Sequence, residues 1–294
     1  MHTAKVVASI ALAALGIYSL LIEPSWIEVS YHHVPDSGQT SLRNSSNSTS
    51  GSSLDSPPER FRIVQLSDLH LHRIGRREES LIEKLSALQP DLLLLTGDVA
   101  DRPESLAVLD AFLGKIATRH KFAVLGNWEY WGEVNLQELR TVYQRHGFKL
   151  LVNECIELAD KGSIYQITGL DDFTAGTPDE TRASDQCRKN PEKPAAPAIT
   201  PAKKQILMQH SPGYFAETKP GKPPPYWLAL SGHTHGGQVR PFGLVLWTPP
   251  GSGPFVSGWY ITDRANLFVS RGIGTSVAPI RFGSRPEVAV FDSL

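Results

Sequence analysis

Side chains of the types that bind metal ions follow five separate apolar segments of this 294-residue sequence. An aspartate or asparagine in such a place usually forms a turn, and a single histidine is more often a hydrogen-bonded polar residue than a ligand. Those ordinary explanations account for each residue alone. They do not explain why an Asp, Asn or His follows every one of the five segments. The ligand-type residues are Asp68, His70, Asp98, Asn127, His210, His233 and His235.

The donor atoms of these residues are nitrogen and oxygen, with no sulfur. Asp68 and His70, like His233 and His235, lie two positions apart and project to the same side where a strand ends. Such donors suit divalent Mn, Fe or Zn, whereas a structural zinc site generally uses cysteine. The set is larger than one tetrahedral ion needs. The residues therefore predict two divalent metal ions that share a carboxylate.

The apolar pattern predicts that strands and helices alternate around these ligands. Short apolar runs come directly before the ligands, and stretches with apolar residues three and four apart separate the first runs. Such alternation is typical of an α/β fold, whose ligand sites lie at the carboxyl ends of the strands. The expected strands are 61–66, 91–96, 121–125, 205–209 and 227–231, and the expected helices are 78–88, 104–118 and 136–145.

Composition narrows the classes of protein and of partner. Hydrophobic residues make up 40% and charged residues 20% of the chain. This composition excludes a chain that is mainly disordered, collagen-like or coiled coil. Lys and Arg number 29 against 30 Asp and Glu, so the chain lacks the basic surface of a nucleic-acid-binding protein. Nothing points to an obligate protein partner. Whether Cys155 and Cys187 form a disulfide is left open by the sequence.

The N-terminal segment predicts a single-pass membrane anchor. The run from Val6 to Ile22 contains no charged residue, and a weak signal-peptidase pattern lies only inside the run, so an anchor is favoured over a cleaved signal sequence. Lys5 precedes the run and no Lys or Arg follows until Arg43, which predicts a cytoplasmic N-terminus. The remainder of the chain is then extracytoplasmic or periplasmic, with the cytoplasmic face as the alternative.

Three parts of the chain follow from these features. Residues 1–22 are the anchor or signal sequence, and residues 23–58 are expected to form a tether rich in Ser and Asn. Residues 59–294 are expected to form one domain. Within it, the polar and Pro-rich stretch 174–204 is expected to be an inserted surface loop.

The ligand-type residues occur in motifs whose order resembles that of the calcineurin-like metallophosphoesterase superfamily. That order is D-x-H, G-D-x-x-D/N, G-N-H-D/E, a single His and G-H-x-H. Further motifs toward the C-terminus resemble the membrane-associated bacterial phosphodiesterase branch of YaeI/YkuE type. The matching segments are Asp68-Leu69-His70, Gly97-Asp98-Val99-Ala100-Asp101, Gly126-Asn127-Trp128-Glu129, His210 and Gly232-His233-Thr234-His235, followed by 236–238, 269–275 and 279–282.

The resemblance implies a fold and a set of roles. The implied fold is α/β: a four-layer αββα sandwich of two mixed sheets flanked by helices, with strands near 267–270 and 287–291 in the second sheet. Asp68, His70 and His235 would bind one ion, and Asp98 would bridge both. Asn127, His210 and His233 would complete the second site. The implied reaction is phosphoester hydrolysis by a metal-bridging hydroxide, with Asp98, Asn127 and His233 as catalytic residues.

One departure from the family pattern concerns proton transfer. Trp128 stands where the family usually has a histidine held to protonate the leaving group, and indole cannot transfer a proton usefully near neutral pH. His72 is a candidate substitute acid, unless it simply lies in a surface loop. Arg73, Arg271 and Arg281 are candidate substrate-binding residues because guanidinium groups match phosphate oxygens, with ordinary surface ion pairs as the alternative for Arg271 and Arg281.

Three functional hypotheses remain from the sequence. The first is a phosphodiesterase or pyrophosphatase acting on a lipid-linked substrate, with UDP-2,3-diacylglucosamine of lipid A synthesis as a specific candidate that requires a cytoplasmic domain. The second is an exported general phosphodiesterase or phosphatase. The third is a non-catalytic metal-binding scaffold, which the complete ligand set disfavours.

Overall fold

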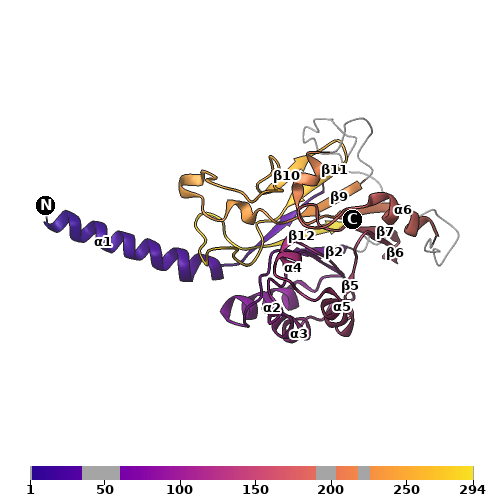
Figure 1. Ribbon diagram of the computed structural model, residues 1–294, viewed down its shortest axis with the longest axis horizontal. Coiled ribbons are helices and arrows are strands. Elements are labelled where there is room, and N and C mark those ends of the chain that lie inside the picture. Colours follow the sequence, from indigo (N-terminus) through magenta and orange to yellow (C-terminus); the bar gives the residue numbers. More distant parts are fainter. Residues whose placement is uncertain (1, 35–59, 190–202, 218–225, 294) are drawn as a thin grey trace, which may run out of the picture.

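Two six-stranded mixed sheets face each other in the computed structural model, which describes residues 2–34, 60–189, 203–217 and 226–293 (Figure 1). The first sheet has the order β1 (Glu28–His32), β12 (Glu287–Ser293), β2 (Phe61–Leu66), β3 (Leu92–Thr96), β4 (His120–Val124), β5 (Lys149–Leu150). The second has the order β10 (Gly258–Ile261), β11 (Ala265–Val269), β9 (Tyr226–Ser231), β8 (Lys203–Met208), β7 (Ser163–Gly169), β6 (Glu154–Asp160).

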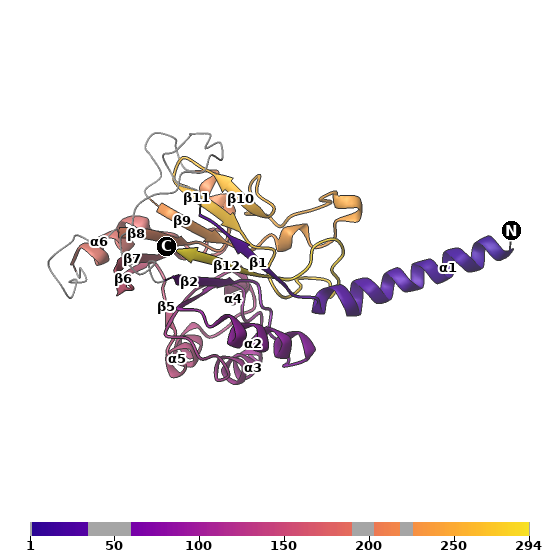
Figure 2. The same cartoon turned by 180° about the vertical axis from the view of Figure 1, so that it is seen from behind.

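Helices cover the outer faces of the two sheets and complete the four layers. The helices α2, α3 and α5 lie on the outside of the first sheet, and α6 packs against β6 of the second (Figures 1 and 2). The predicted αββα sandwich is therefore confirmed. One expected strand is misplaced, because β12, expected in the second sheet, pairs with β2 and belongs to the first. The helices are α1 (His2–Ile17), α2 (Arg76–Leu88), α3 (Ser105–Leu113), α4 (Asn127–Trp131), α5 (Leu136–Arg145) and α6 (Glu180–Lys189).

The leucine run of β3 shows why the first sheet is buried on both sides. Successive side chains of a strand point to opposite faces. Leu92 and Leu94 accordingly belong to the core between the sheets, whereas Leu93 and Leu95 belong to the core under the helices. A continuous apolar run without polar alternation is what a central parallel strand requires. Its neighbours β2 and β4 are both parallel to it, so the carboxyl ends of all three strands reach the same edge.

Most predicted elements of the domain have nearly the expected bounds. The strand 61–66 and the helix 136–145 agree at both ends. The helix α3 ends at Leu113 instead of residue 118, because the chain tightens at Gly114: the amides of Lys115 and Ile116 donate to carbonyl oxygens only three residues back.

The predicted tether begins too early. Residues 28–32 are not part of a tether but form β1, which pairs in parallel with β12 at the edge of the first sheet. Just before this strand, the buried carboxylate of Glu23 accepts hydrogen bonds from the backbone N–H groups of Gly283 and Ser284. The chain that leaves the apolar helix is therefore attached to the domain. Residues 35–58 of the predicted tether lie outside the described residues.

The N-terminal apolar segment is long enough to cross a membrane. Residues Lys5–Ser25 form a 21-residue helical stretch with a mean hydropathy of 2.1, of which 11% is buried within the protein. Both views show α1 extending away from the sandwich (Figures 1 and 2). Length and composition agree with an anchor, and a cleavable signal sequence would have the same properties.

The predicted surface loop 174–204 contains a covalently attached helix. Helix α6 lies within it, and Cys187 of this helix forms a disulfide with Cys155 of β6, with 5.4 Å between the Cα atoms. Both cysteines are buried in an apolar cluster outside the second sheet. This disulfide answers the question that the sequence leaves open. The prediction of a loop fails because the short helix carries only two buried side chains, Ala183 and Cys187.

The disulfide is expected to stabilise the domain. It closes a loop with a sequence separation of 32 residues, for which chain entropy gives about 3–4 kcal/mol. Replacing both cysteines by serine should lower the free energy of unfolding by about that amount, as measured by urea denaturation. A double variant as stable as the parent, under conditions where the parent is oxidised, would contradict this expectation.

Candidate metal centre

The predicted ligands meet at one edge of the sandwich, where the carboxyl ends of parallel strands from both sheets converge. In the first sheet, Asp68 and His70 follow β2, Asp98 follows β3, and Asn127 follows β4 at the start of α4. His210, after β8, and the pair His233 and His235, after β9, come from the second sheet. All seven side chains are buried, with at most 3% of any residue exposed. The site therefore exists only when the two sheets pack together.

The ligand atoms form two groups with the composition that the sequence predicts. In the first group, His235 Nε2 lies 3.5 Å from Asp68 Oδ1 and 3.3 Å from His70 Nε2. In the second group, which contains Asp98, His210 and His233, the donor atoms lie within 4.8 Å of one another. Asn127 joins this second group: its Oδ1 is 3.2 Å from His210 Nε2 and 2.8 Å from His233 Nδ1.

Asp98 lies between the two groups. Its Oδ2 is 3.1 Å from His210 Nε2 in the second group and 3.8 Å from His70 Nε2 in the first. Its Oδ1 accepts a hydrogen bond from the backbone N–H of Trp128. Gly126, the residue before Asn127, lies so close to Asp98 that any Cβ at this position would collide with the Asp98 carboxylate. The glycine thus keeps space for the one carboxylate that reaches both groups.

Backbone strain is concentrated at these residues. Left-handed φ angles are uncommon for residues other than glycine, and each costs on the order of 1–3 kcal/mol. Strain of this kind persists where the surrounding structure imposes it, and it is common at functional sites. The strained ligand residues are Asp68 (φ 53°), His70 (φ 43°), Asp98 (φ 53°), His233 (φ 70°) and His235 (φ 50°).

Backbone carbonyl groups set the tautomers of two histidines. His210 Nδ1 lies 2.7 Å from the carbonyl oxygen of Thr96, and His233 Nε2 lies 2.7 Å from that of Pro250. A carbonyl oxygen only accepts, so these ring nitrogens carry the hydrogen. The other nitrogen of each ring then faces Asn127 and the centre of the site, where it would bind an ion in its deprotonated form. This arrangement is typical of histidines that bind metal ions, and it shows that the residues fit such a role.

Burial and neighbouring charges shift the pKa values of the ligand side chains in different directions. Burial would raise the pKa of Asp98, but the opposing effect of His210 and its neighbours outweighs burial and lowers that pKa to about 2. Burial, followed by the nearby His210, lowers the pKa of His233. Burial and the neighbouring His70 lower the pKa of His235 well below its ordinary value. For these three residues the lowered pKa values favour the carboxylate and the neutral imidazoles that divalent ions require. Burial would lower the pKa of His210, but the carboxylate of Asp98 outweighs burial and raises that pKa well above its ordinary value, so a bound ion would have to displace that proton.

Glu129 is a structural residue of the site to which the sequence analysis assigns no role. Its buried carboxylate accepts hydrogen bonds from the backbone N–H groups of Gly126, Asp98, Val99 and Ala100, and it thereby holds together the loops after β3 and β4. Burial, and then the charge of Asp98, raise its pKa to about 7. Its place at the end of the G-N-x-E motif is the signal that could have identified it.

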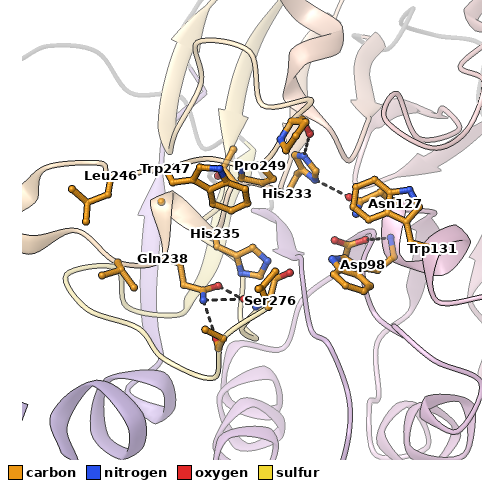
Figure 3. A pocket seen from close by; sticks show the side chains of 17 residues that line it. Asp98, Asn127, Trp131, His233, His235, Gln238, Leu246, Trp247, Pro249 and Ser276 are labelled. Atoms are coloured by element: carbon orange, nitrogen blue, oxygen red, sulfur yellow. Dashed lines mark hydrogen bonds between the residues drawn. The ribbon is translucent and has the colours of Figure 1, made fainter. Parts of the chain in front are cut away.

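A largely apolar cavity of about 620 Å³ opens over the second ligand group. Figure 3 shows Trp131 and Trp247 on opposite sides of this cavity, with His233 and His235 between them. Trp128 also lines it and makes an edge-to-face contact with the His70 ring, with 6.1 Å between ring centroids. The candidate reaction centre is thus next to a space that favours apolar ligands.

Two arginines predicted to bind substrate have other partners. Arg281 is fully buried and donates to the carbonyl oxygens of Gly274, Ser284 and Arg271, so it cannot reach a phosphate in the cavity. Arg271 forms ion pairs with Glu287 and Glu28. Neither arginine lines the cavity, so the structure brings neither of them to the place where a phosphate would bind.

The other two predicted residues lie on the surface. His72 has 41% of its side chain exposed and contacts Asp101 at 2.8 Å, while the same carboxylate lies 3.6 Å from His70 Nδ1. Arg73 is exposed. Neither lines the cavity, so the structure brings neither of them to the ligand groups.

Comparison with known proteins identifies the family. Residues 61–237 match the family model described as calcineurin-like phosphoesterase. The uncharacterized metallophosphoesterase YkuE of Bacillus subtilis is 32% identical over 244 residues, covering 79% of this chain and 78% of its own length. YkoQ of the same organism, also described as an uncharacterized metallophosphoesterase, is 29% identical over 238 residues, covering 78% of this chain and 82% of its own.

A mammalian relative and a solved structure extend the comparison. A Bos taurus transmembrane protein with a metallophosphoesterase domain is 28% identical, covering 78% of this chain and 52% of its own length. The structure of the sulfate thiohydrolase SoxB from Thermus thermophilus in complex with glycerol has 12% identity and a TM-score of 0.47, covering 81% of this chain and 57% of that one. The family match and the first relative show that this chain belongs to the calcineurin-like phosphoesterases, in their YkuE-like branch.

Proposed function

We propose that this metal-dependent phosphoesterase binds two divalent ions, Mn, Fe or Zn, and hydrolyses phosphodiester or pyrophosphate bonds. Asp68, His70 and His235 hold one ion, Asn127, His210 and His233 hold the other, and Asp98 is shared. The observation that carries the proposal is the convergence of the two ligand groups on either side of Asp98. When bound, the ions would activate water and neutralise charge on the phosphoryl oxygens.

The protein's own groups prepare this site in advance. Carbonyl acceptors orient His210 and His233, and Glu129 holds the loops of Asp98 and Asn127 at a constant separation. Burial excludes water from the ligands, which strengthens their electrostatic interactions. Asp98, Asn127 and His233 line the cavity, where an entering phosphoryl group would meet them. A site fixed in this way needs little rearrangement during the reaction.

Replacement of Asp98 tests this proposal. The variant Asp98→Ala removes the shared ligand, and hydrolysis of bis(p-nitrophenyl) phosphate by protein supplied with Mn²⁺ should fall at least a hundredfold. Asp110→Asn is the matched control, because that aspartate lies in a surface ion pair with Arg145. Chelation should abolish activity and added Mn²⁺ should restore it. Full activity of the Asp98 variant would refute the role of a shared ligand.

Trp128 indicates the kind of leaving group. Its indole stands beside His70 at the cavity and offers no usable proton, and His72 lies on the surface. We infer that the substrate loses a group that departs without protonation, such as a phosphate from a pyrophosphate bond. This inference does not require a substitute acid.

A histidine at position 128 should broaden the range of leaving groups. We expect Trp128→His to increase hydrolysis of an alkyl phosphodiester by at least tenfold relative to a p-nitrophenyl diester, since general acid catalysis typically contributes about 10²–10⁴-fold. Trp128→Phe is the control for loss of the indole alone. Equal changes on both substrates would show that Trp128 does not limit the choice of leaving group.

We also propose that α1 anchors the chain and that the domain lies outside the cytoplasm. Two observations support this orientation: Lys5 precedes the span, and the Cys155–Cys187 disulfide is of a kind that is rare in reducing compartments. An extracytoplasmic domain favours an exported phosphodiesterase acting on lipid or wall phosphates. Hydrolysis of UDP-2,3-diacylglucosamine would need the opposite orientation.

Reporter fusions decide the orientation. Alkaline phosphatase fused after Leu294 should be active in cells, and a fluorescent protein that folds only in the cytoplasm should be dark in the same place. The reverse pair of results would reject the exported function and would favour the lipid A precursor. A scaffold without catalysis remains the third candidate, and the complete and correctly oriented ligand set disfavours it.

A further inference from the structure

We propose that an exposed apolar surface beside the cavity is a second membrane contact, in addition to α1, and that it places the cavity mouth at the lipid surface. This surface, called the apolar rim, belongs to two loops. Its residues and their exposed fractions are Phe242 (99%), Leu244 (64%), Val245 (38%), Leu246 (65%), Trp247 (62%) and Val277 (87%).

The apolar rim is unusual in both composition and backbone geometry. The stretch 241–247 contains no charged side chain and no hydroxyl group. Phe242 and Val277 have left-handed φ angles of 56° and 63°, which are strained conformations for bulky residues. Two of the most exposed apolar residues described therefore have a strained backbone. Contiguous exposed apolar surface of this kind typically marks an interaction site.

Hydrogen bonds connect the apolar rim to the base of the anchor. The amide of Arg240 donates to the carbonyl oxygen of Phe282, and the amide of Phe282 donates to that of Gln238, directly before the rim. The Phe282 ring meets the ring of Tyr18 edge-to-face, with 6.2 Å between centroids, and the amide of Arg281 donates to the carbonyl oxygen of Ser19. Both views show this part of the sandwich on the side from which α1 emerges (Figures 1 and 2).

Helix length places this junction at the edge of a bilayer. The 21-residue span Lys5–Ser25 would be about 31 Å long as a regular α-helix, and the hydrocarbon core of a bilayer is about 30 Å thick. The whole span is then needed to cross the core. Yet Tyr18 and Ser19, within the span, already contact the domain. The face of the domain that carries the apolar rim must therefore press against the membrane.

A lipid surface is the occupant that these observations favour over a second copy of the chain or another protein. Trp26, at the end of the span, is 52% exposed, and the Arg285 guanidinium lies 4.9 Å from its ring centroid. Trp26 and Trp247 are both amphipathic rings of the kind that settles at a membrane interface, and a nearby cation suits lipid headgroups. The contact needs no partner other than the bilayer that α1 already enters.

The apolar rim continues into the cavity of the metal centre. Leu246, Trp247 and Val277 line the cavity together with Asp98 and His233, whereas Phe242 and Leu244 do not. An apolar chain could therefore pass from the bilayer into the cavity while its phosphate stays near the ligands. This consequence for the substrate rests on the proposed hydrolysis, whereas the membrane contact itself rests only on the proposed anchor.

Spin labelling of the full chain in phosphatidylcholine–phosphatidylglycerol vesicles tests the membrane contact without any activity. Both native cysteines are in the disulfide, so a nitroxide attaches to an introduced cysteine alone. In Phe242→Cys the label should collide with oxygen at least threefold more, relative to a nickel chelate, than in Ile261→Cys. Ile261 is the control because it is 81% exposed on β10, at the end of the second sheet opposite the ligands. Equal ratios, or a label shielded from both reagents as in a protein interface, would overturn the proposal.

Two matched substrates test its consequence. The double variant Phe242→Ser/Leu244→Ser should hydrolyse hexadecyl p-nitrophenyl phosphate in vesicles at least fivefold more slowly, and methyl p-nitrophenyl phosphate in solution at the parent rate. Ile261→Ser should change neither rate. Equal effects of the double variant on both substrates would overturn delivery from the membrane. If the parent hydrolyses neither substrate, the proposed function fails, and the spin-label result still decides the membrane contact.

Discussion

The burial of carboxylate and imidazole groups at one edge of the sandwich is the constraint on which the rest of the structure depends. Buried charges are costly unless they are paired or bind metal ions. Here the two ligand groups bring Asp68 and Asp98 among four imidazoles, with strained backbone at five of the seven predicted ligands. Carbonyl oxygens accept hydrogen bonds from His210 and His233, and the Glu129 carboxylate accepts hydrogen bonds from the backbone of the surrounding loops. An arrangement that costs this much in the absence of ions is explained by the ions that it would bind.

The sandwich supplies this arrangement because its two sheets each carry half of the site. The aspartates, Asn127 and His70 follow strands of the first sheet, whereas His210, His233 and His235 follow strands of the second. The apolar core between the sheets, to which Leu92 and Leu94 of β3 belong, therefore sets the distance between the ligand halves. Close packing of apolar side chains away from the site therefore fixes the relative positions of the ligands.

Much of this could be predicted from the sequence, for physical reasons that also explain the failures. Parallel strands are long apolar runs that end together, so β3 and the residues after it were visible as a pattern. The edge strand β1 was hidden because its residues are only partly buried and its partner, β12, lies at the other end of the chain. The positions of Arg271 and Arg281 also depend on tertiary packing: Arg281 is fully buried against nearby carbonyl groups, and Arg271 pairs with Glu28 near the other end of the chain.

The proposed anchor would bring the metal centre close to a membrane. The central claim, however, is that two ions lie on either side of Asp98. The most direct measurement is an anomalous difference map from crystals of the chain grown with Mn²⁺. The account predicts two peaks, one within bonding distance of Asp68, His70 and His235 and one within bonding distance of Asn127, His210 and His233, with Asp98 contacting both. A single peak, or none, at a Mn²⁺ concentration that supports full activity would contradict it.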